Sequence, residues 1–244
     1  MDIRRFKKFI KPLINTPLHP QWHTARGGTL IELLSAIKST DKTLDIGCYD
    51  KWTKKHINAK SSYIGLDYLE TASKWYFSKP DIYGDAHSLP LGDSTIDNVL
   101  LLDVLEHVSH IDTVLEESFR VLKIEGKAVI KIPFLYPLHD EPRDFVRLTK
   151  YGIKQKATNT GFTVSTIYSS GHPLETAALL KNIAVSKVFI HWLGRKNPLF
   201  LLSPLLPLYF LLQNLSSFIL AKTTPDDDLM PYSYLIILTK NKCL

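Results

Sequence analysis

Apolar runs rich in β-branched residues alternate with helical patterns between Lys42 and about Gly161. This alternation is typical of a parallel sheet wrapped by helices, and the short connections fit right-handed crossover units. Five runs predict strands, namely Thr43–Ile46, Ser62–Leu66, Ile82–Tyr83, Ile96–Leu102 and Lys127–Ile132. The helices predicted between them are Lys51–Ile57, Tyr68–Phe77 and Ile111–Leu122.

Two more strands complete the predicted sheet. After Pro133 comes a stretch rich in proline and charge, followed by a predicted helix at Lys150–Asn159 and a strand at Phe162–Tyr168, which we expect at the far edge of the sheet. The alternating, β-branched run Tyr232–Thr239 predicts the last strand. The predicted fold class is α/β, a Rossmann-like, doubly wound, mostly parallel seven-stranded sheet with an apolar helical insertion before the last strand.

The insertion, residues 169–231, contains a leucine-rich run that carries no charge from Asn197 to Ala221. This run is long enough to cross a bilayer. A single crossing would place Tyr232–Thr239 on the wrong side of the membrane for the sheet, and the polar pair Gln213–Asn214 would be costly in hydrocarbon. An interfacial or monotopic element is therefore the favoured interpretation, beside a buried helical lid and a span or re-entrant hairpin.

Length and charge refine the organisation of the chain. Its 244 residues suit one α/β domain with an elaborate insertion, and 45% hydrophobic with 22% charged residues excludes a largely disordered chain. We expect a basic amphipathic cap at 1–41, a core at 42–168 with 232–240, and the insertion at 169–231. Cations interleave with bulky apolar residues at Ile3–Lys11, which fits either an interfacial helix on an anionic leaflet or a cap over a site.

The cysteine pattern indicates a reducing compartment. Cys48 and Cys243 are too few for a disulfide framework and lack the paired Cys/His spacing of a structural zinc site, so no metal site is predicted. The first residues carry no apolar core of a secretory signal. We expect a cytoplasmic protein, with peripheral contact at the inner face of the membrane.

Acidic residues follow successive predicted strands, at the edge where open α/β sheets bind ligands. Asp45 precedes Gly47, a glycine at the tight turn where a ligand can approach the backbone. About twenty residues later Asp67 ends the second strand, in position to accept both hydroxyls of a ribose. Asp85 could accept an adenine amino group while the Ala86 amide meets a ring nitrogen. Taken singly, each acid could instead cap a helix or a turn.

These segments and the exit of the fourth strand, Leu102–Val108, resemble in order and spacing the signature of class I S-adenosylmethionine-dependent methyltransferases of the type 11-like, small-molecule kind. The resemblance continues through Phe119–Lys127, which looks like the helix-to-strand turn before the fifth strand. It implies a methyltransferase with S-adenosylmethionine as cofactor. The cofactor-binding residues that it implies are Asp45, Gly47, Cys48, Asp67, Tyr68, Asp85, Ala86, His87, Leu102, Asp103 and His107.

The sequence departs from the family pattern directly after Gly47. The family commonly has a second and a third glycine there, whereas this chain has Cys48–Lys51. Bulkier side chains would alter how the methionine moiety sits, which keeps open a cofactor-binding partner subunit without activity. Glu106 and His107 match the acid–histidine pair that follows the fourth strand in the family, where we expect them to order the loop rather than to catalyse.

The stretch after the fifth strand should face the methyl group. Pro133–Thr149 combines an imidazole, acids and guanidiniums with prolines and aromatic residues, which suits a polyhydroxylated or charged acceptor. It also resembles the Pro-x-His-x-x-Pro-x-Asp-x-x-Arg-x-Thr segment of methyltransferase-like proteins associated with bacterial surface-polysaccharide synthesis.

The candidate base in this stretch is His139, because its ordinary pKa is close to neutral. Asp140 or Asp144 could orient it or serve instead. The alternative is structural, with Asp144 and Arg147 paired one helical turn apart and His139 capping the loop. The predicted acceptor-binding residues are Tyr136, Arg143 and Arg147, whose guanidiniums would hold a carboxylate or a phosphate.

The leading hypothesis is O-methylation of a sugar or glycan precursor, small or lipid-linked, in cell-surface polysaccharide synthesis. The rival enzyme is a lipid or quinone methyltransferase, whose apolar acceptor would use the region Leu199–Ala221. The inactive, cofactor-binding partner subunit is the third hypothesis. Nucleic acid is not an expected partner, because the basic residues lie beside apolar ones and no recognition motif is present.

Overall fold

The computed structural model describes residues 11–225 and 227–242. The predicted interfacial helix at Ile3–Lys11 lies outside the described residues except for its last one, and Cys243 lies outside them as well. The chain forms two compact units, which are described separately. One comprises residues 1–27, 135–137 and 170–232, and the other comprises residues 28–134, 138–169 and 233–244.

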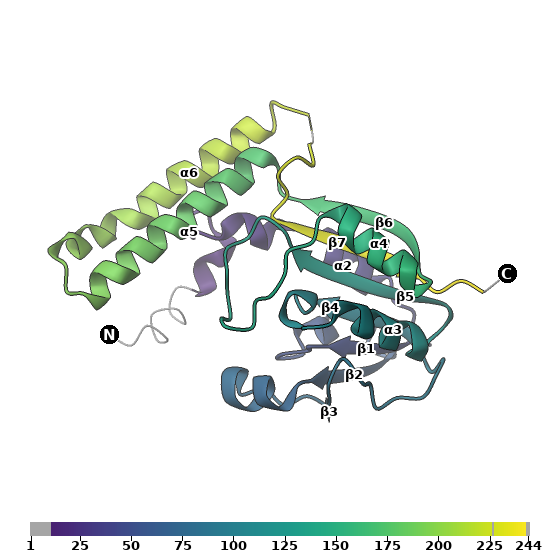
Figure 1. Cartoon of the computed structure of the whole chain (residues 1–244). Helices are drawn as coiled ribbons and strands as arrows, with labels where there is room; N and C mark the ends of the chain where they lie inside the picture. Colours follow the sequence, from purple (N-terminus) through teal and green to yellow (C-terminus); the bar gives the residue numbers. More distant parts are fainter. Residues whose placement is uncertain (1–10, 226, 243–244) are drawn as a thin grey trace. The chain divides into compact units, whose positions relative to one another are not determined.

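The larger unit is built on a seven-stranded sheet with the strand order β3-β2-β1-β4-β5-β7-β6 (Figure 1). The neighbours from β3 to β5 are parallel, and β7 pairs antiparallel with β5. The predicted fold class is therefore confirmed, with β6 at the edge. The strands are β1 (Lys42–Ile46), β2 (Ser62–Asp67), β3 (Ile82–Tyr83), β4 (Ile96–Leu102), β5 (Leu122–Pro133), β6 (Thr163–Ser170) and β7 (Ser233–Thr239).

Strand β5 begins earlier than predicted. Leu122 already pairs with Ile96, and the register then shifts so that Lys127 pairs with Asn98. The residues between form a bulge rather than the expected helix-to-strand turn. Gly126 belongs to this bulge, and a Cβ added to it would lie 2.7 Å from the carbonyl oxygen of Lys123. Gly126 permits this close approach of two backbone segments inside the strand, and from the sequence alone such a glycine is easily mistaken for a turn residue.

Three α-helices accompany the sheet, namely α2 (Thr29–Ser35), α3 (Ile111–Val121) and α4 (Lys150–Thr160). The helix predicted at Lys51–Ile57 is wrong, because only the short 3-10 helix η3 (Trp52–Lys55) forms there. The prediction at Tyr68–Phe77 is also revised, since the structure has the π-helix η4 (Thr71–Tyr76). It ends where Phe77 takes a left-handed φ of 53°, shortly before Pro80, and proline disfavours helix in the residue before it.

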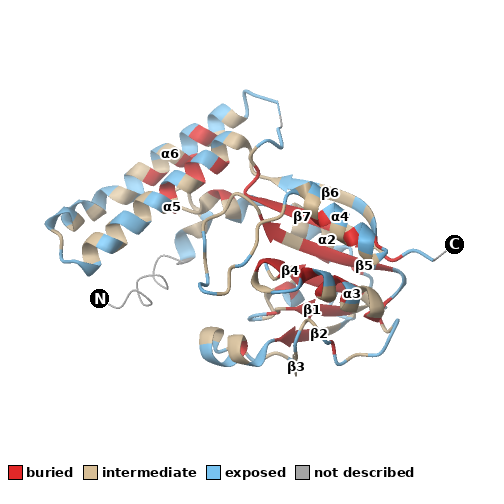
Figure 2. Ribbon diagram, viewed as in Figure 1, coloured by how far each residue is buried: buried red, intermediate tan, exposed pale blue. Residues whose placement is uncertain are grey.

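The core lies on both faces of the sheet, as a doubly wound fold requires (Figure 2). Alternate side chains of a strand point to opposite faces. Val99 and Leu101 of β4 therefore join α3 and α4 in the larger cluster, whereas Leu100 joins Leu34 of α2 in the smaller one. This packing holds the carboxyl ends of β1, β2, β4 and β5 at one edge.

The smaller unit is a pair of helices with N-terminal turns packed against them. Helix α5 (Pro173–Gly194) is followed by η6 (Pro198–Leu205) and α6 (Leu206–Ala221), and α5 and α6 run side by side (Figure 1). The N-terminal turns are η1 (Lys11–Asn15) and η2 (Trp22–Arg26). Asn182 donates to Asn214 at 2.9 Å, and Asn214 donates to the carbonyl oxygen of His19 at 2.9 Å. These buried amides fasten the N-terminal segment to the helices.

Within the smaller unit the uncharged run is mostly exposed. No described residue of η6 is buried, and α6 buries only Phe210, Asn214 and Ser217. The helical lid and the interfacial element both stay predictions. One described segment, Pro198–Ala221, is long and apolar enough to cross a membrane by length and composition alone.

Candidate functional site

The turn after β1 approaches its neighbours closely. Gly47 has a φ of 71°, and a Cβ added to it would lie 2.5 Å from Cγ2 of Val104. Tyr49 and Lys51 also take left-handed conformations, with φ of 47° and 58°. Both belong to the stretch Cys48–Lys51, which stands where the family pattern has its further glycines. The loop from Gly47 to Lys51, called here the β1 loop, thus has left-handed backbone at all three positions although only the first is glycine.

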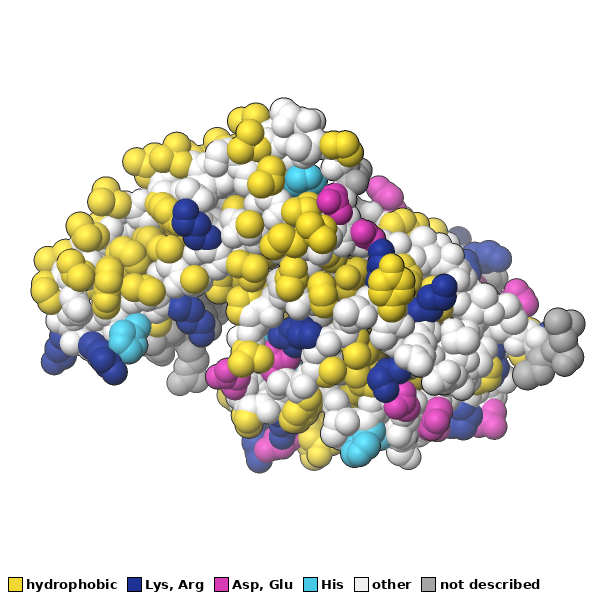
Figure 3. Space-filling view, turned by 45° about the horizontal axis from the view of Figure 1, so that its top comes forward, with side chains coloured by type: hydrophobic (Ala, Val, Ile, Leu, Met, Phe, Trp, Pro, Cys, Tyr) yellow, Lys and Arg dark blue, Asp and Glu magenta, His cyan; other side chains and the backbone are white. Residues whose placement is uncertain are grey.

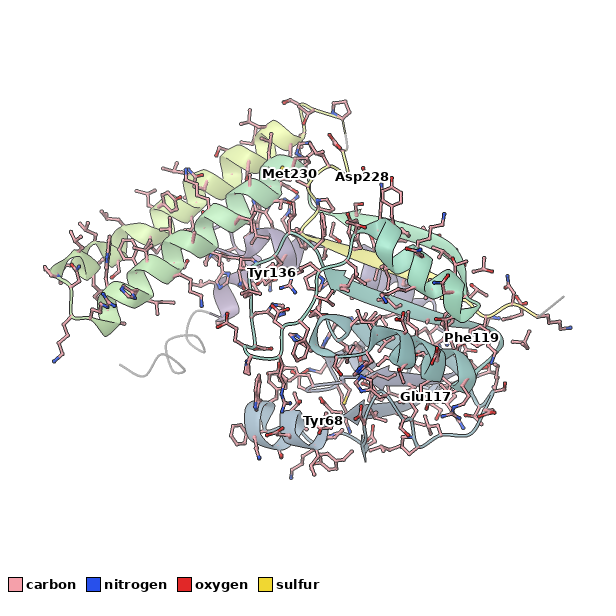
Figure 4. All side chains as sticks on the ribbon, in the orientation of Figure 1. Tyr68, Glu117, Phe119, Tyr136, Asp228 and Met230 are labelled. Atoms are coloured by element: carbon pink, nitrogen blue, oxygen red, sulfur yellow. The ribbon has the colours of Figure 1, made fainter. Side chains whose placement is uncertain are left out.

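Asp67 is fixed at the end of β2. Its carboxylate is buried and accepts hydrogen bonds from the backbone N–H groups of Tyr49 at 3.1 Å and Tyr68 at 2.8 Å. Burial raises the pKa of Asp67, and the two backbone hydrogen bonds oppose this rise. Tyr68 directly follows the strand and is about half exposed (Figure 4). Each carboxylate oxygen has further acceptor capacity, so Asp67 is a fixed acceptor beside the β1 loop.

Asp45 has different partners. Its carboxylate is buried and accepts hydrogen bonds from the hydroxyls of Tyr63, at 2.6 Å, and Thr53. Burial raises the pKa of Asp45 to about 6 against these two hydrogen bonds. The carboxylate therefore ties β1 to η3 and β2. Cys48 is also buried, and burial followed by the neighbouring carboxylates raises the pKa of its thiol to about 12, so the thiol is neutral at physiological pH.

The remaining predicted cofactor residues lie at two further turns. Asp85 Oδ1 accepts the backbone N–H of His87 at 2.9 Å and lies 2.7 Å from Nδ1 of the same residue, with the half-exposed Ala86 between them. At the end of β4 the half-buried Leu102 precedes Asp103, whose φ is 56°. The Asp103 carboxylate forms an ion pair with Lys131 of β5 at 2.6 Å.

Loop 138–149 brings together three of the predicted acceptor-side residues. The backbone N–H of His139 donates to Asp144 at 2.9 Å, and the His139 Nδ1 atom lies 3.2 Å from the same carboxylate oxygen. Arg147 donates to both oxygens of Asp144, and the hydrogen bond from Arg147 lowers the pKa of Asp144 to about 2. The segment is irregular, so the Asp144–Arg147 pair forms without the helical turn that the sequence suggested.

The other predicted residues of this stretch have separate partners. Arg143 pairs with Glu70, and its guanidinium lies 5.2 Å from the ring centre of Trp75. Asp140 accepts a hydrogen bond from the hydroxyl of Tyr76, and the Tyr76 ring packs edge-on against Tyr49 at 5.0 Å. Loop 138–149 is thereby connected to the β1 loop. The structure does not bring Asp140 to His139.

Tyr136 belongs to the smaller unit, where its hydroxyl accepts a hydrogen bond from Gln21 at 2.8 Å (Figure 4). His139 and Asp67 belong to the larger unit. Its assignment to acceptor binding stays a prediction.

A group that the sequence reasoning did not assemble lies beneath loop 138–149. Glu106 and His107 of η5 (Leu105–His107) meet His139, and we call these three residues the Glu106 cluster. Oε1 of Glu106 lies 3.7 Å from Nε2 of His139 and 3.8 Å from Nε2 of His107. The pair at 106–107 was visible in the sequence, but no local pattern indicates that His139 approaches it.

The same two residues hold the loop in place. The carbonyl oxygen of Glu106 accepts the backbone N–H of Phe145 at 2.8 Å, and Nδ1 of His107 lies 2.7 Å from the carbonyl oxygen of Arg143. Both contacts fix loop 138–149 over η5. They agree with the expectation that the acid–histidine pair orders a loop.

Part of the larger unit is similar in sequence to a known protein family. Residues 44–130 match the family model described as "Methyltransferase domain". The matched stretch, less than half of the chain, is similar to a methyltransferase domain. No curated protein matches the chain. The methyltransferase domain makes the protein an enzyme of the transferase class, and S-adenosylmethionine is its cofactor.

Solved structures share the fold at low identity. SpnF, a [4+2]-cyclase, is 12% identical with a TM-score of 0.56, and 99% of this chain and 96% of SpnF are covered. A Haloferax volcanii protein solved with the Trm112 methyltransferase activator is 14% identical with a TM-score of 0.54, covering 96% and 95%. Phosphoethanolamine N-methyltransferase 2 from Haemonchus contortus, in complex with S-adenosylmethionine, is 16% identical with a TM-score of 0.52, covering 97% and 60%.

The residues at the edge of the sheet fit this cofactor. The Cβ-free turn at Gly47 permits close approach to the backbone, and the fixed Asp67 carboxylate can accept from ribose hydroxyls. The Tyr49 ring of the β1 loop packs edge-on against the Tyr76 ring of η4, beside the Asp67 carboxylate that accepts the Tyr49 N–H. The methionine end of the cofactor would therefore meet aromatic side chains.

Proposed function

We propose that this methyltransferase O-methylates a hydroxyl of a sugar or glycan precursor, small or lipid-linked, in the synthesis of a cell-surface polysaccharide. The observation that carries the proposal is loop 138–149, which presents His139 with the buried carboxylates of Asp144 and Glu106. The loop is connected to the cofactor side through Asp140, Tyr76 and Tyr49. An acceptor held at this loop would lie at the carboxyl edge of the sheet, where open α/β folds bind ligands.

The chemistry requires a positioned hydroxyl and a group that removes its proton. When bound, S-adenosylmethionine supplies a methyl group on a sulfonium, so that a C–O bond forms as the C–S bond breaks with its electron pair on sulfur. We assign removal of the hydroxyl proton to the Glu106 cluster, which includes the candidate base His139. Asp144 orients this imidazole at Nδ1.

The acceptor is better described as polyhydroxylated than as anionic. Arg143 and Arg147, which the sequence assigned to a phosphate or carboxylate, are paired with Glu70 and Asp144. An anionic acceptor would have to compete with these carboxylates. A sugar needs only hydrogen bonds from the side chains of the loop.

The helical pair α5–α6 supports contact with an anionic membrane surface. Figure 3 shows hydrophobic side chains gathered over these helices. The large exposed ones include Leu201 at 78%, Leu212 at 61% and Leu205 at 60% exposure. From residue 176 to residue 222 the sequence has five Lys or Arg and no Asp or Glu. Apolar exposure combined with positive charge is typical of an interfacial element at the inner face of the membrane.

Transfer of a labelled methyl group tests the function. Purified protein with labelled S-adenosylmethionine is incubated with sugar nucleotides, with lipid-linked glycan precursors and with a quinone and phospholipid extract. Label in a glycan that mild acid releases from its carrier is the expected result. Label confined to solvent-extractable lipid without sugar would instead support the rival lipid or quinone methyltransferase.

A third result concerns the inactive partner subunit. Cofactor binding without transfer to any fraction would contradict the proposed activity. His139→Gln should abolish transfer while cofactor binding is retained. His110→Gln is the matched control, because His110 is exposed and lies outside the Glu106 cluster.

A further inference from the structure

The carboxylate of Glu106 is buried without a hydrogen bond. Its side chain is 0% exposed, and neither oxygen has a hydrogen-bond partner among the described residues. A buried ionised carboxylate is costly unless it is paired with a cation or supplied with donors. The imidazole nitrogens at 3.7 and 3.8 Å are beyond hydrogen-bonding distance. Arg147, which donates to both oxygens of Asp144, also interacts electrostatically with Glu106 but forms no hydrogen bond with it.

The two imidazoles of the Glu106 cluster are oriented in the same way. Nδ1 of His107 lies 2.7 Å from the carbonyl oxygen of Arg143, which can only accept, so Nδ1 carries the proton and Nε2 presents a lone pair toward Glu106. Nδ1 of His139 lies 3.2 Å from Asp144, and its Nε2 is also turned toward Glu106. Histidines that bind metals are typically held at the distal nitrogen by a carbonyl or carboxylate in this manner.

We propose that Glu106, His107 and His139 bind a divalent transition-metal ion of the zinc type. Their ligand atoms all lie within 4.8 Å of one another. Around a tetrahedral zinc ion, bonds of about 2.0–2.2 Å place ligand atoms about 3.3–3.6 Å apart. The separations from Glu106, 3.7 and 3.8 Å, need to close by a few tenths of an ångström, and the imidazole nitrogens of His107 and His139, which lie within 4.8 Å, by up to about 1.5 Å.

The composition of the site fits such an ion. Two histidines and one glutamate form a ligand set known for zinc, and imidazole also suits neighbouring transition metals. Three protein ligands leave a fourth position open. The His107 and His139 side chains are 22% and 30% exposed, so an ion can reach the carboxylate from the side of loop 138–149. A divalent cation would also satisfy the buried charge of Glu106.

The role of this ion rests on the proposed O-methylation. An ion held by Glu106, His107 and His139 would lower the pKa of an acceptor hydroxyl bound at the open position, so that the hydroxyl would lose its proton to water more readily. With the ion bound, His139 would be a metal ligand in place of the base assigned to it above, and the Glu106 cluster would promote loss of the hydroxyl proton through the ion. The metal site itself does not depend on the identity of the acceptor.

Direct metal binding tests the proposal. The full chain is stripped with a chelator and titrated with Zn²⁺ against a chromophoric competitor, and with Co²⁺ while the visible absorption is recorded. We expect one ion per chain and a Co²⁺ spectrum typical of nitrogen and oxygen ligands. Glu106→Gln, His107→Gln and His139→Gln should each weaken the affinity by about 100-fold or more, since even supporting residues around metals contribute about 10–100-fold. His110→Gln should leave it unchanged.

Circular dichroism shows which variants retain the fold. The metal affinity of any one folded variant, compared with that of the wild type, is enough to test the proposal. Absence of Zn²⁺ and Co²⁺ binding by the wild-type chain, or equal losses in His139→Gln and His110→Gln, would overturn the proposal. Cofactor binding and methyl transfer are measured separately on the same samples. Metal binding without transfer would contradict only the proposed function, whereas transfer by a chain that binds no metal would contradict only the metal site.

Discussion

The backbone N–H of Tyr49 donates to Oδ2 of Asp67 at 3.1 Å while Tyr49 itself has a left-handed φ of 47°. The turn after β1 and the acid at the end of β2 are therefore held as one arrangement. A non-glycine residue in this conformation costs about 1–2 kcal/mol. The surrounding contacts, including the edge-on packing of Tyr49 against Tyr76, offset this cost.

We expect glycine to be preferred over alanine at position 51. Lys51 has a φ of 58°, where alanine is strained and glycine is not, so Lys51→Gly should be more stable than Lys51→Ala by about 1 kcal/mol. Both variants lose the ion pair with Asp81, so this loss cancels in the comparison. At the exposed Lys55 of η3 the order should reverse. Denaturant unfolding of the four variants measures both differences, and the same order at both positions would contradict the assigned backbone.

Removal of the Asp67 carboxylate should weaken cofactor binding. Hydrogen bonds to charged groups contribute about 1.5–3 kcal/mol each, so Asp67→Ala should lower the affinity for S-adenosylmethionine and S-adenosylhomocysteine by about 100-fold. Calorimetric titration gives these affinities. Asp112→Ala removes an exposed carboxylate in the first turn of α3 that pairs with Lys156 of α4, and it serves as the control. Equal affinities in the two variants would show that the ribose is held elsewhere.

Glu175 should make the stability of the smaller unit depend on pH. Burial raises its pKa, but the hydrogen bonds and charges of His23 and Arg26 lower it to about 2. Because the folded value is depressed, the stabilisation is present above the ordinary pKa of about 4.5 and is lost as pH falls toward 2. The shift corresponds to about 3 kcal/mol at neutral pH.

The matching experiment compares Glu175→Gln with Glu116→Gln. Glu116 is exposed, and the structure records no ion pair for it among the described residues. Unfolding free energies measured from pH 7 to pH 3 should converge for wild type and Glu175→Gln as the pH falls. A constant difference between them across this range would contradict the depressed pKa.

The exposed leucines of the smaller unit should carry membrane binding. Burying a leucine side chain contributes about 1.5–3 kcal/mol, so Leu201→Asn with Leu212→Asn should weaken binding to phosphatidylglycerol vesicles by about 100-fold. Co-sedimentation with vesicles measures the affinity, and neutral phosphatidylcholine vesicles should bind the wild type less well. Tyr151→Asn, an exposed aromatic residue of the larger unit, is the control. Unchanged binding by the leucine variant would exclude these helices as the contact.

The sequence predicts the centre of the sheet better than its connections. Ile96–Leu102 is recognisable because a strand covered on both faces is a continuous apolar run, and its bounds are confirmed. The start of β5 is missed because Gly126 has the appearance of a turn residue although it lies in a bulge. Helix η3 is shorter than its pattern suggests, because Thr53 turns its hydroxyl to Asp45 and the chain returns directly to β2.

The site shows the same limit. The position of Asp67 at the carboxyl edge of the sheet can be predicted from topology alone, because parallel strands end at a common edge. The partners of Arg143 and the approach of His139 to Glu106 depend on how an irregular loop folds over η5. No periodic pattern in the sequence encodes contacts of this kind. The sequence therefore suggests that the Arg143 guanidinium binds an acceptor, whereas the structure pairs it with Glu70.

Strand β7 lies between β5 and β6 in the sheet, although helices α5 and α6 separate it from β6 along the chain. During synthesis on the ribosome, β6 therefore emerges before the only strand that flanks it in the sheet. The apolar helices are made in this interval. The order of translation thus completes the helices of the smaller unit before the strand that closes the sheet of the larger unit.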